Sequence, residues 1–195
     1  MGLGDAHAPG ATPLDPNEID GLLPSHITTQ EQLNEWEQAN IARAMAWLAL
    51  ARKRSVLDES FVRELHTRMF NDTWRWAGSF RSTERNIGVA PEQIAPKLRN
   101  LLDDARYWLQ HATYTVDEAA ARFHHRLVLI HCFANGNGRH ARLLTDLLLQ
   151  ANGAAPFTWG RGDLVHVGAA RELYLAALGR ADAGDFSALL RFVRS

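Results

Sequence analysis

The chain has 195 residues, enough for one domain with a sizeable hydrophobic core and short for two. Hydrophobic residues make up 46% and charged residues 22%, as in ordinary globular proteins, so disorder is expected only within about the first twenty residues. The formal net charge of -1 argues against a general nucleic-acid-binding or membrane-binding surface.

The cellular compartment is indicated by three features of the sequence. The single cysteine, Cys132, excludes an internal disulfide and fits a reducing environment. The N-terminus lacks a basic start followed by an apolar core, so no signal peptide is expected. The longest apolar runs are far below membrane-spanning length. We therefore expect a cytoplasmic protein that contacts neither a membrane nor nucleic acid directly.

The first part of the chain divides into an arm and a helix. Residues 1–24 are rich in Gly, Pro, Asp and Ala and are expected to form an extended arm, with residues 25–195 forming the folded domain. Thr28 or Thr29 can cap a helix over residues 30–54, because Glu or Gln follows each by three residues. The apolar stripe of this helix consists of Leu33, Trp36, Ile41, Ala44 and Leu48.

The rest of the chain is also mostly helical in pattern. Residues 71–96 have no helical period, several aromatic residues and two glycines, so they are expected to form a loop with a short β-hairpin. Further helices are expected at 58–70, 96–111, 116–130, 164–178 and 186–193, and one more between the glycines after His131 and the stop signal Asn152-Gly153. The predicted fold class is all-α with one small hairpin.

The sequence HCFANGNGRHAR, residues 131–142, contains a candidate anion site. Gly136, Asn137 and Gly138 come directly before a predicted helix. Glycines allow backbone N–H groups to converge, and a helix N-terminus carries partial positive charge, so this turn suits a phosphate. Arg139 and Arg142 are three residues apart on the first turns and can lean toward the same anion.

His131 ends the helix before this site and could serve as a general base. A base, a phosphate cradle and two guanidinium groups together indicate phosphoryl or nucleotidyl transfer. His124, His125 and His140 lie nearby in the sequence, but a histidine metal site is disfavoured. The adjacent His124 and His125 would point about a hundred degrees apart on a helix, and neither an HExxH pattern nor a cysteine pair occurs.

Residues 131–142 read H-x-F-x-N-G-N-G-R-x-x-R and closely resemble the signature of the Fic/Doc family, H-x-F-x-[D/E]-G-N-G-R-x-x-R. WAGSFR, residues 76–81, resembles the family's W-A-G-x-x-R segment, which leads into a flap that holds the target. The C-terminal YLAALGRADAGDFSALLRFV is also similar to the family, and GATPLDPNEIDGLLPSHITTQEQLNEWEQANI resembles a subgroup labelled "mobile mystery protein B". The resemblance implies a Fic-like helical bundle with one short β-hairpin flap.

The resemblance also implies a reaction, protein AMPylation by a nucleotidyltransferase. The motif histidine of Fic enzymes takes the proton of a Ser, Thr or Tyr hydroxyl on a target protein, that oxygen attacks the α-phosphate of ATP, and pyrophosphate leaves. On this sequence His131 would be the base, Phe133 would pack inward, and Mg²⁺ would bridge two phosphates. The phosphate-binding residues would be Asn135, Gly136, Asn137, Gly138, Arg139 and Arg142, and the target-aligning residues Asn86, Ile87, Gly88 and Val89.

Asn135 departs from the family pattern, which has a magnesium-binding Asp or Glu at this position. A neutral amide attracts Mg²⁺ more weakly than a carboxylate does. Three alternatives stay open: slow AMP transfer, transfer of another phosphate-linked group, and a non-catalytic binding protein, for example one half of a pair whose partner is encoded nearby on a mobile element. Doc-like phosphotransferases usually end the motif A-N-K-R, so G-N-G-R favours nucleotide transfer.

Glu37 lies on the apolar stripe of the first long helix, where a carboxylate needs a cation. Many Fic proteins carry an inhibitory helix, [S/T]-x-x-x-E-[G/N], whose Glu pairs with the second motif arginine. Residues 25–54 are therefore a candidate inhibitory region in which Glu37 would contact Arg142. Leu33 and Gln38 do not match the flanking positions, so a purely structural Glu37 is the alternative. The sequence identifies neither the target protein, the preferred nucleotide nor the oligomeric state.

Overall fold

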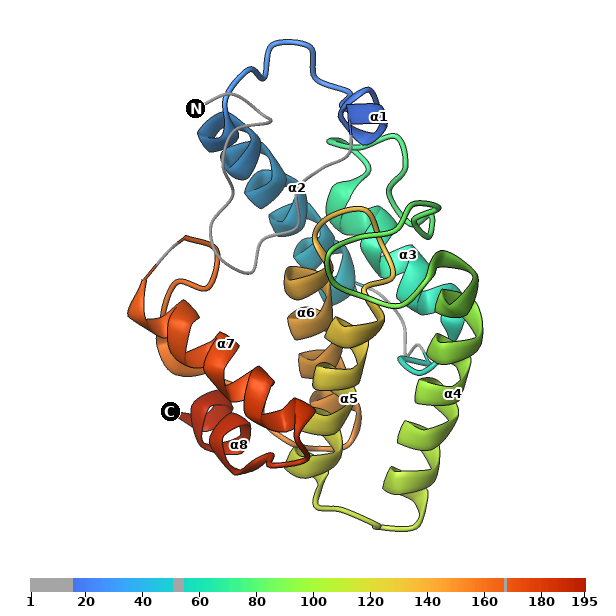
Figure 1. Ribbon diagram of the computed structural model, residues 1–195, viewed down its shortest axis with the longest axis vertical. Helices are drawn as coiled ribbons and strands as arrows, with labels where there is room; N and C mark the ends of the chain where they lie inside the picture. The colour runs from blue at the N-terminus through green and yellow to red at the C-terminus, as the bar shows by residue number, and fades with distance from the viewer. Residues whose placement is uncertain (1–15, 51–54, 167) are drawn as a thin grey trace.

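The computed structural model describes residues 16–50, 55–166 and 168–195, and in these the predicted all-α fold class is confirmed (Figure 1). The elements are α1 (Pro16–Ile19), α2 (Gln30–Leu50), α3 (Glu59–Phe70), α4 (Pro91–Gln110), α5 (Val116–Ile130), α6 (Asn137–Ala151), the 3-10 turn η1 (Trp159–Arg161), α7 (Ala169–Asp182) and α8 (Ser187–Arg194). The β structure among the described residues is one isolated antiparallel bridge between Leu22 and Trp74. None of the helices in this part of the chain is both long and apolar enough to cross a bilayer.

The start of α2 follows the predicted capping pattern. The side-chain oxygen of Gln32 accepts a hydrogen bond from the backbone N–H of Thr29 at 3.1 Å, and the Thr29 hydroxyl accepts from the backbone N–H of Gln32 at 3.3 Å. These reciprocal bonds satisfy two N–H groups that a helix start leaves without partners. The last expected residues of this helix, 51–54, lie outside the described residues.

Two hydrophobic clusters hold the helices together. The larger one lies among α2 to α6, and its largest fully buried side chains include Leu33, Leu65, Phe70, Trp74, Ile94, Leu98, Phe123 and Phe133. The smaller one joins η1, α7 and α8 to the inner faces of α5 and α6 through Ala120, Ala121 and Leu149. Because both clusters contain α5 and α6, the loop that connects these two helices is supported from both sides.

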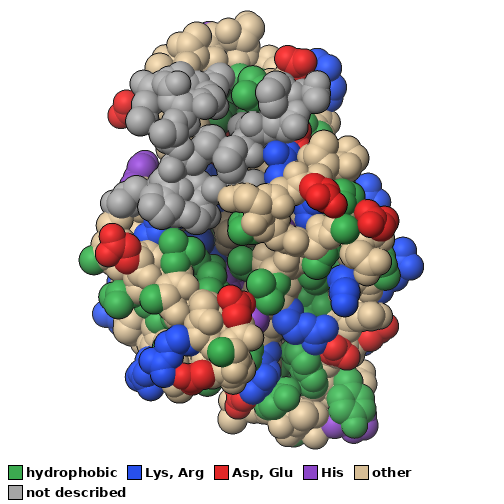
Figure 2. Space-filling model, viewed as in Figure 1, with side chains coloured by type: hydrophobic (Ala, Val, Ile, Leu, Met, Phe, Trp, Pro, Cys, Tyr) green, Lys and Arg blue, Asp and Glu red, His purple; other side chains and the backbone are tan. Residues whose placement is uncertain are grey.

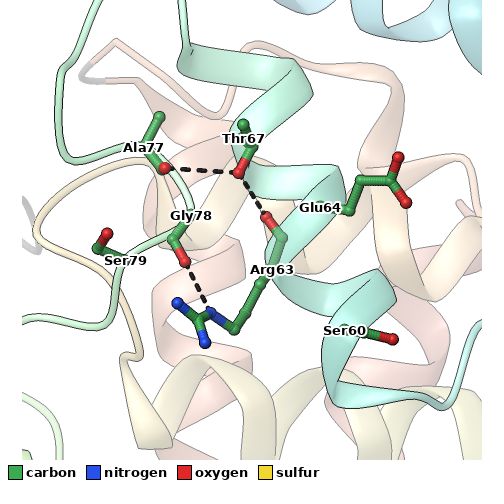
Figure 3. A pocket seen from close by; sticks show the side chains of 7 residues that line it. All are labelled: Ser60, Arg63, Glu64, Thr67, Ala77, Gly78 and Ser79. Atoms are coloured by element: carbon green, nitrogen blue, oxygen red, sulfur yellow. Dashed lines mark hydrogen bonds between the residues drawn. The ribbon is translucent and has the colours of Figure 1, made fainter.

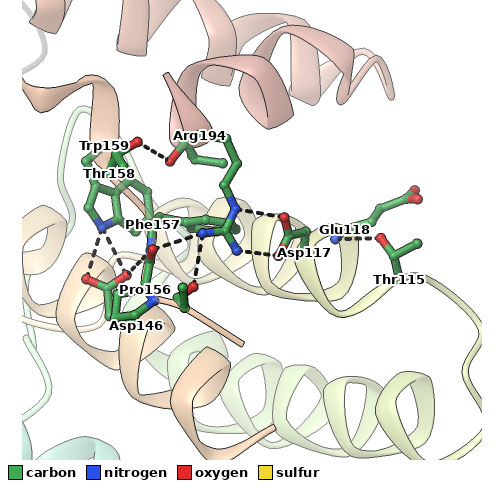
Figure 4. Close-up of polar contacts among 11 residues, drawn as sticks. Thr115, Asp117, Glu118, Asp146, Pro156, Phe157, Thr158, Trp159 and Arg194 are labelled. Carbon is green, nitrogen blue, oxygen red and sulfur yellow. Dashed lines mark hydrogen bonds and ion pairs between the residues drawn. The ribbon is translucent and has the colours of Figure 1, made fainter. Parts of the chain in front are cut away.

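The C-terminal helix is fastened to the start of α5 by polar contacts (Figure 4). Arg194 Nε donates to Asp117 at 2.8 Å, and Arg194 Nη1 donates to the carbonyls of Ala155 and Pro156 at 3.0 and 2.9 Å. The indole N–H of Trp159 donates to the carboxylate of Asp146 on α6 at 3.0 Å. These bonds hold α5 and α6 at points distant from the loop of residues 131–136 that connects them.

Two helix starts differ from the prediction. The fourth helix begins at Pro91 and not at Pro96, because Pro91 takes the first helical position and Pro96 is accommodated inside the helix at the cost of one backbone hydrogen bond. The seventh begins at Ala169 and not at residue 164. The carboxylate of Asp163 accepts from the backbone N–H groups of Val165 and His166 at 2.7 and 3.2 Å, so the chain turns here before α7.

The expected β-hairpin is absent from the described residues, which include the whole of 71–96. Within residues 82–90 the backbone is irregular. The N–H of Arg81 donates to the carbonyl of Cys132 at 3.0 Å, and that of Val89 donates to the carbonyl of Ile130 at 3.4 Å. The segment therefore bonds to the end of α5, and a hairpin would need those groups for pairing with itself.

The N-terminal region also contains more structure than an extended arm, although residues 1–15 lie outside the described part. Residues 16–19 form α1, and Arg75 N donates to the carbonyl of Gly21 at 2.8 Å while Leu23 N donates to that of Thr73 at 2.9 Å. On the face drawn in Figure 2, basic and acidic side chains are interspersed over the described surface.

Candidate active site

The loop between α5 and α6 is closed by one side chain. Asn137 Oδ1 accepts from the backbone N–H of Phe133 at 2.9 Å, and Asn137 Nδ2 donates to the Phe133 carbonyl at 2.7 Å. Phe133 itself is fully buried, as expected. Gly136 has φ 76°, and a Cβ there would lie 2.4 Å from Phe70 Cζ, so only glycine fits. The polar atoms of the Asn137 side chain thus shape the loop from within.

The N-terminus of α6 can hold an anion. The first intrahelical bond is donated by His140 N to the Gly136 carbonyl at 2.9 Å, so the amides of residues 137–139 precede the helical hydrogen-bond ladder. A Cβ added at Gly138 would meet only Arg142 Nη1, at 3.6 Å, which leaves room for a ligand to approach the backbone. The N–H of Gly136 is occupied by Asn135 Oδ1 at 2.5 Å. The phosphate cradle is therefore one residue shorter than the sequence predicts.

His131 is the C-cap of α5 and has a left-handed backbone, with φ 54° and ψ 63°. This conformation costs a non-glycine residue about 1 kcal/mol, so surrounding contacts must hold it. The side chain is 6% exposed, and its pKa is lowered to about 4 by burial, by the positive charges of Arg81 and Arg85, with partial compensation from the Val128 backbone. His131 is therefore neutral at pH 7 and able to accept a proton.

His66, which the sequence analysis did not single out, supports the loop from α3. Its Nδ1 accepts from the N–H of Gly78 at 3.0 Å and its Nε2 contacts the carbonyl of Asn135 at 3.0 Å, so the neutral ring carries its proton on Nε2. The ring stacks on Phe133 with centroids 3.8 Å apart. Burial, the nearby His140 and Arg139 lower its pKa well below the usual range. In the sequence His66 is a lone histidine on a helix, and that pattern does not distinguish a loop-supporting histidine from any other buried one.

Glu37 contacts Arg139 and not the expected Arg142. Glu37 Oε2 lies 2.7 Å from Arg139 Nη2, and Glu37 Oε1 accepts from the indole N–H of Trp74 at 2.6 Å. The carboxylate is 1% exposed. Arg139 lies on the first turn of α6, on the side that faces α2, whereas Arg142 lies one turn further and faces α7. The first motif arginine is therefore the one that the buried carboxylate neutralises.

Arg142 packs against the C-terminal helices. Its guanidinium carbon lies 6.0 Å from the ring centre of Tyr174 on α7. Burial lowers the Arg142 pKa, and Tyr174 partly opposes that shift. The Tyr174 hydroxyl in turn lies 2.7 Å from His124 Nε2, which has a pKa lowered to about 3 by burial and by Arg142. The two motif arginines thus have different protein partners, although they lie close enough for Arg139 to lower the Arg142 pKa further.

The residues near Asn135 do not fit a magnesium ion held by the protein. The Asn135 amide oxygen is neutral and already accepts from Gly136 N–H. No group of three or more His, Cys, Asp or Glu residues suited to a metal occurs in the described residues. The histidines near the motif are engaged elsewhere: His124 with Tyr174, His125 Nε2 with Asp182 at 2.8 Å, and His140 Nε2 with the Val62 carbonyl at 2.9 Å.

The predicted target-aligning segment lies directly against the base. Asn86, Ile87 and Gly88 are exposed, and a Cβ added at Gly88 would come within 2.7 Å of His131 Cβ. The structure therefore brings this segment and His131 together. Val89 differs from its neighbours because its N–H already donates a hydrogen bond to the Ile130 carbonyl. Backbone pairing with a target is thus open to residues 86–88.

A shallow hollow of about 310 Å³ lies outside this arrangement, between α3 and the turn that follows Trp76 (Figure 3). Arg63 Nε donates to the Gly78 carbonyl at 2.9 Å, and the Thr67 hydroxyl contacts the carbonyls of Arg63 and Ala77 at 3.0 and 3.4 Å. These bonds hold the turn whose Gly78 N–H contacts His66. The hollow is thus the outer face of the support beneath the loop.

The motif loop lies within a region of the chain that matches a known protein family. Residues 56–149 match the model of the Fic/DOC family. The chain carries a Fic/DOC family domain. It is 32% identical over 152 residues to "Protein adenylyltransferase fic-1" of Caenorhabditis elegans, an alignment that covers 74% of this chain and 28% of that protein.

Solved structures show the same fold. A fragment of Fic-1 from C. elegans aligns with a TM-score of 0.64 and 27% identity over 90% of this chain and 50% of that chain. BepC, a VirB-translocated effector from Bartonella tribocorum solved with bound AMPPNP, aligns with a TM-score of 0.69 and 18% identity over 92% of this chain and 97% of that chain. The chain spans about half of the solved Fic-1 fragment and 28% of the length of the curated relative.

Proposed function

We propose that this Fic domain protein is a protein adenylyltransferase that transfers AMP from ATP to a Ser, Thr or Tyr hydroxyl of a target protein. The observation that carries the proposal is the packing of the neutral His131 against Gly88 of the exposed residues 86–88, on the loop that leads into the N-terminus of α6. A base, a target-aligning edge and an anion site are the parts that this transfer requires. The name of the C. elegans relative supports the same activity.

In the proposed reaction, His131 takes the hydroxyl proton as the target oxygen bonds to the α-phosphorus and the bond to the β-phosphate oxygen breaks, releasing pyrophosphate. Residues 137–139 would bind phosphate oxygens through their amides. Negative phosphates near His131 would raise its pKa from about 4 toward the working pH, because they favour the imidazolium. Arg139 would hold the leaving phosphates once they displace Glu37.

The nucleotide is proposed to enter as MgATP, with the metal held through the phosphates and not by a protein carboxylate. The neutral Asn135 supports this view, and it also supports slow transfer. Glu37 is proposed to restrain the reaction by occupying Arg139. The N-terminal sequence supports a place in the subgroup "mobile mystery protein B" and a partner encoded nearby on a mobile element, and the single cysteine, Cys132, supports a cytoplasmic location.

Incubation of the protein with ATP labelled separately at the α- and γ-phosphate, in lysate of its native host, tests the proposal. Adenylyl transfer predicts α-label on protein and none from the γ position. γ-Label alone would indicate a Doc-like phosphotransferase. Absence of both labels, with ATP binding retained, would indicate a non-catalytic nucleotide-binding protein. Mass spectrometry of the labelled band would identify the target.

A further inference from the structure

Arg81 bonds both to the segment of residues 82–90 and to the end of α5. Its side chain is 4% exposed, and four backbone carbonyls accept from it. The acceptors are His131 at 2.7 Å from Nε, Thr83 at 2.8 Å from Nη1, and Val89 and Ile130 from Nη2, the last at 3.5 Å. A buried guanidinium is thus satisfied by carbonyl dipoles from two separate segments.

Two of these carbonyls belong to the end of a helix. The carbonyls of Ile130 and His131 lie at the C-terminal end of α5, where the last carbonyls have no N–H donors within the helix and carry partial negative charge. A cation that donates to them caps the helix. Because the His131 carbonyl is fixed by Arg81, the left-handed backbone of His131 is fixed as well.

The other two carbonyls hold the segment that passes over His131. Thr83 and Val89 flank residues 84–88, of which all but Arg85 are exposed, and one guanidinium bonds to both carbonyls. At Gly88, which has φ +104°, an added Cβ would lie 2.7 Å from Arg81 Nη2 and from His131 Cβ. The segment, the guanidinium and the histidine are therefore packed without space for one additional carbon.

We propose that Arg81 is a positioning residue that sets His131 and residues 84–88 in one fixed arrangement, so that the base faces the aligned target hydroxyl. The inference rests on the proposed transfer reaction for its functional consequence, and on the contacts of Arg81 alone for its structural part. The planar fork of arginine is required, because a lysine ammonium is a single point and cannot donate to four carbonyls on two segments.

Arg81→Lys tests this proposal, with Arg81→Met and the exposed Arg75→Lys as companions. Hydrogen exchange on the full chain should show at least tenfold faster exchange at the Val89 amide and in residues 130–132 of Arg81→Lys, and unchanged exchange in α8. The maximal labelling rate with α-labelled ATP should fall about 10²-fold, since small misplacements of a base have effects of this size. The half-saturating ATP concentration should stay the same, and Arg75→Lys should match the wild type.

The outcomes separate the competing explanations. If the charge of Arg81 alone matters, Arg81→Lys will behave as the wild type and only Arg81→Met will be slow, which overturns the proposal. If Arg81→Lys does not fold by circular dichroism, Gly88→Ala perturbs the same junction, and a wild-type rate in that variant also overturns it. If the wild type labels no protein, the transfer reaction is wrong, while the exchange result still decides whether Arg81 holds the two segments together.

Discussion

The two ends of the motif loop, residues 131–139, are held in opposite ways. At the first end, His131 is fixed through its backbone, and its side chain is left neutral beside the target-aligning segment. At the second end, the Arg139 side chain itself is occupied, because the buried carboxylate of Glu37 holds the charge that phosphates would use. In the proposed reaction the base, His131, is therefore ready to accept a proton, whereas Arg139 would first have to exchange Glu37 for the phosphates.

The largest effect is expected from removing the base. His131→Ala should reduce the labelling rate by 10²- to 10⁴-fold or more while leaving ATP binding close to the wild-type value, because the phosphate-binding end is unchanged. Rates from α-labelled ATP and affinity from calorimetry measure the two quantities. Labelling at the wild-type rate would show that the first end of the loop is not the catalytic one.

A smaller change in the labelling rate, of the order of tenfold, is expected when Arg139 at the second end of the loop is released from Glu37. Glu37→Gln removes the charge that pairs with Arg139 but keeps an oxygen for the Trp74 indole. Labelling should rise, and the melting temperature should fall because a buried cation loses its partner. The control is the exposed Glu35→Gln on the same helix. A lower melting temperature without increased labelling would make Glu37 purely structural.

Asn135 lies between the two ends of the loop, and its replacement is expected to change the labelling rate several-fold. Asn135→Asp keeps the oxygen that accepts from Gly136 N–H and adds a negative charge near the phosphates. Charge-assisted contacts are roughly twice as strong as neutral ones, so the magnesium concentration for half-maximal labelling should fall and the rate should rise. Unchanged or reduced labelling would mean that Asn135 suits a different donor or ion position.

The smallest effect on activity, but a measurable one on stability, is expected from pH. His66, His131 and His140 are buried with pKa values below 6.5, about 4 for the latter two, mainly because of burial. Below pH 6.5 the unfolded chain binds protons that the folded chain does not, so the free energy of unfolding falls as pH decreases toward 4. Urea unfolding at pH 7 and pH 5 should differ by about 2 kcal/mol or more.

His140→Gln should reduce this pH dependence, while replacement of the exposed His111 by Asn should leave it unchanged. Equal unfolding free energies at pH 7 and pH 5 in the wild type would contradict the buried, neutral state of His66, His131 and His140.

The sequence predicted local features well and the support of the loop poorly. The bounds of α5 were predicted to the residue, because Thr115 caps it and the periodicity is strong, with Thr115 Oγ1 accepting from Glu118 N at 3.2 Å. The irregular segment after Arg81 was not predicted, since its hydrogen bonds go to residues about fifty positions away. Long-range contacts of this kind leave no periodic signal in the sequence.

The same limit explains the three residues near the site that were missed or misassigned. Sequence similarity identified a Glu on an apolar stripe, but only packing decides that Glu37 faces Arg139 and not Arg142. His66 and Arg81 act by bonding to backbone carbonyls and amides, whose positions depend on the tertiary fold. The motif residues, by contrast, are adjacent in sequence, so the sequence alone groups them, while the separate partners of Arg139 and Arg142 depend on packing.

Single-turnover labelling over a range of ATP concentrations tests the contrast between the two ends most directly. Measured with α-labelled ATP for the wild type, Glu37→Gln and Arg81→Lys, it gives a half-saturating concentration and a maximal rate for each. The account predicts that Glu37→Gln lowers the half-saturating concentration, whereas Arg81→Lys lowers only the maximal rate. If both variants changed the same quantity in the same way, the two ends of the loop would not have the separate roles assigned to them.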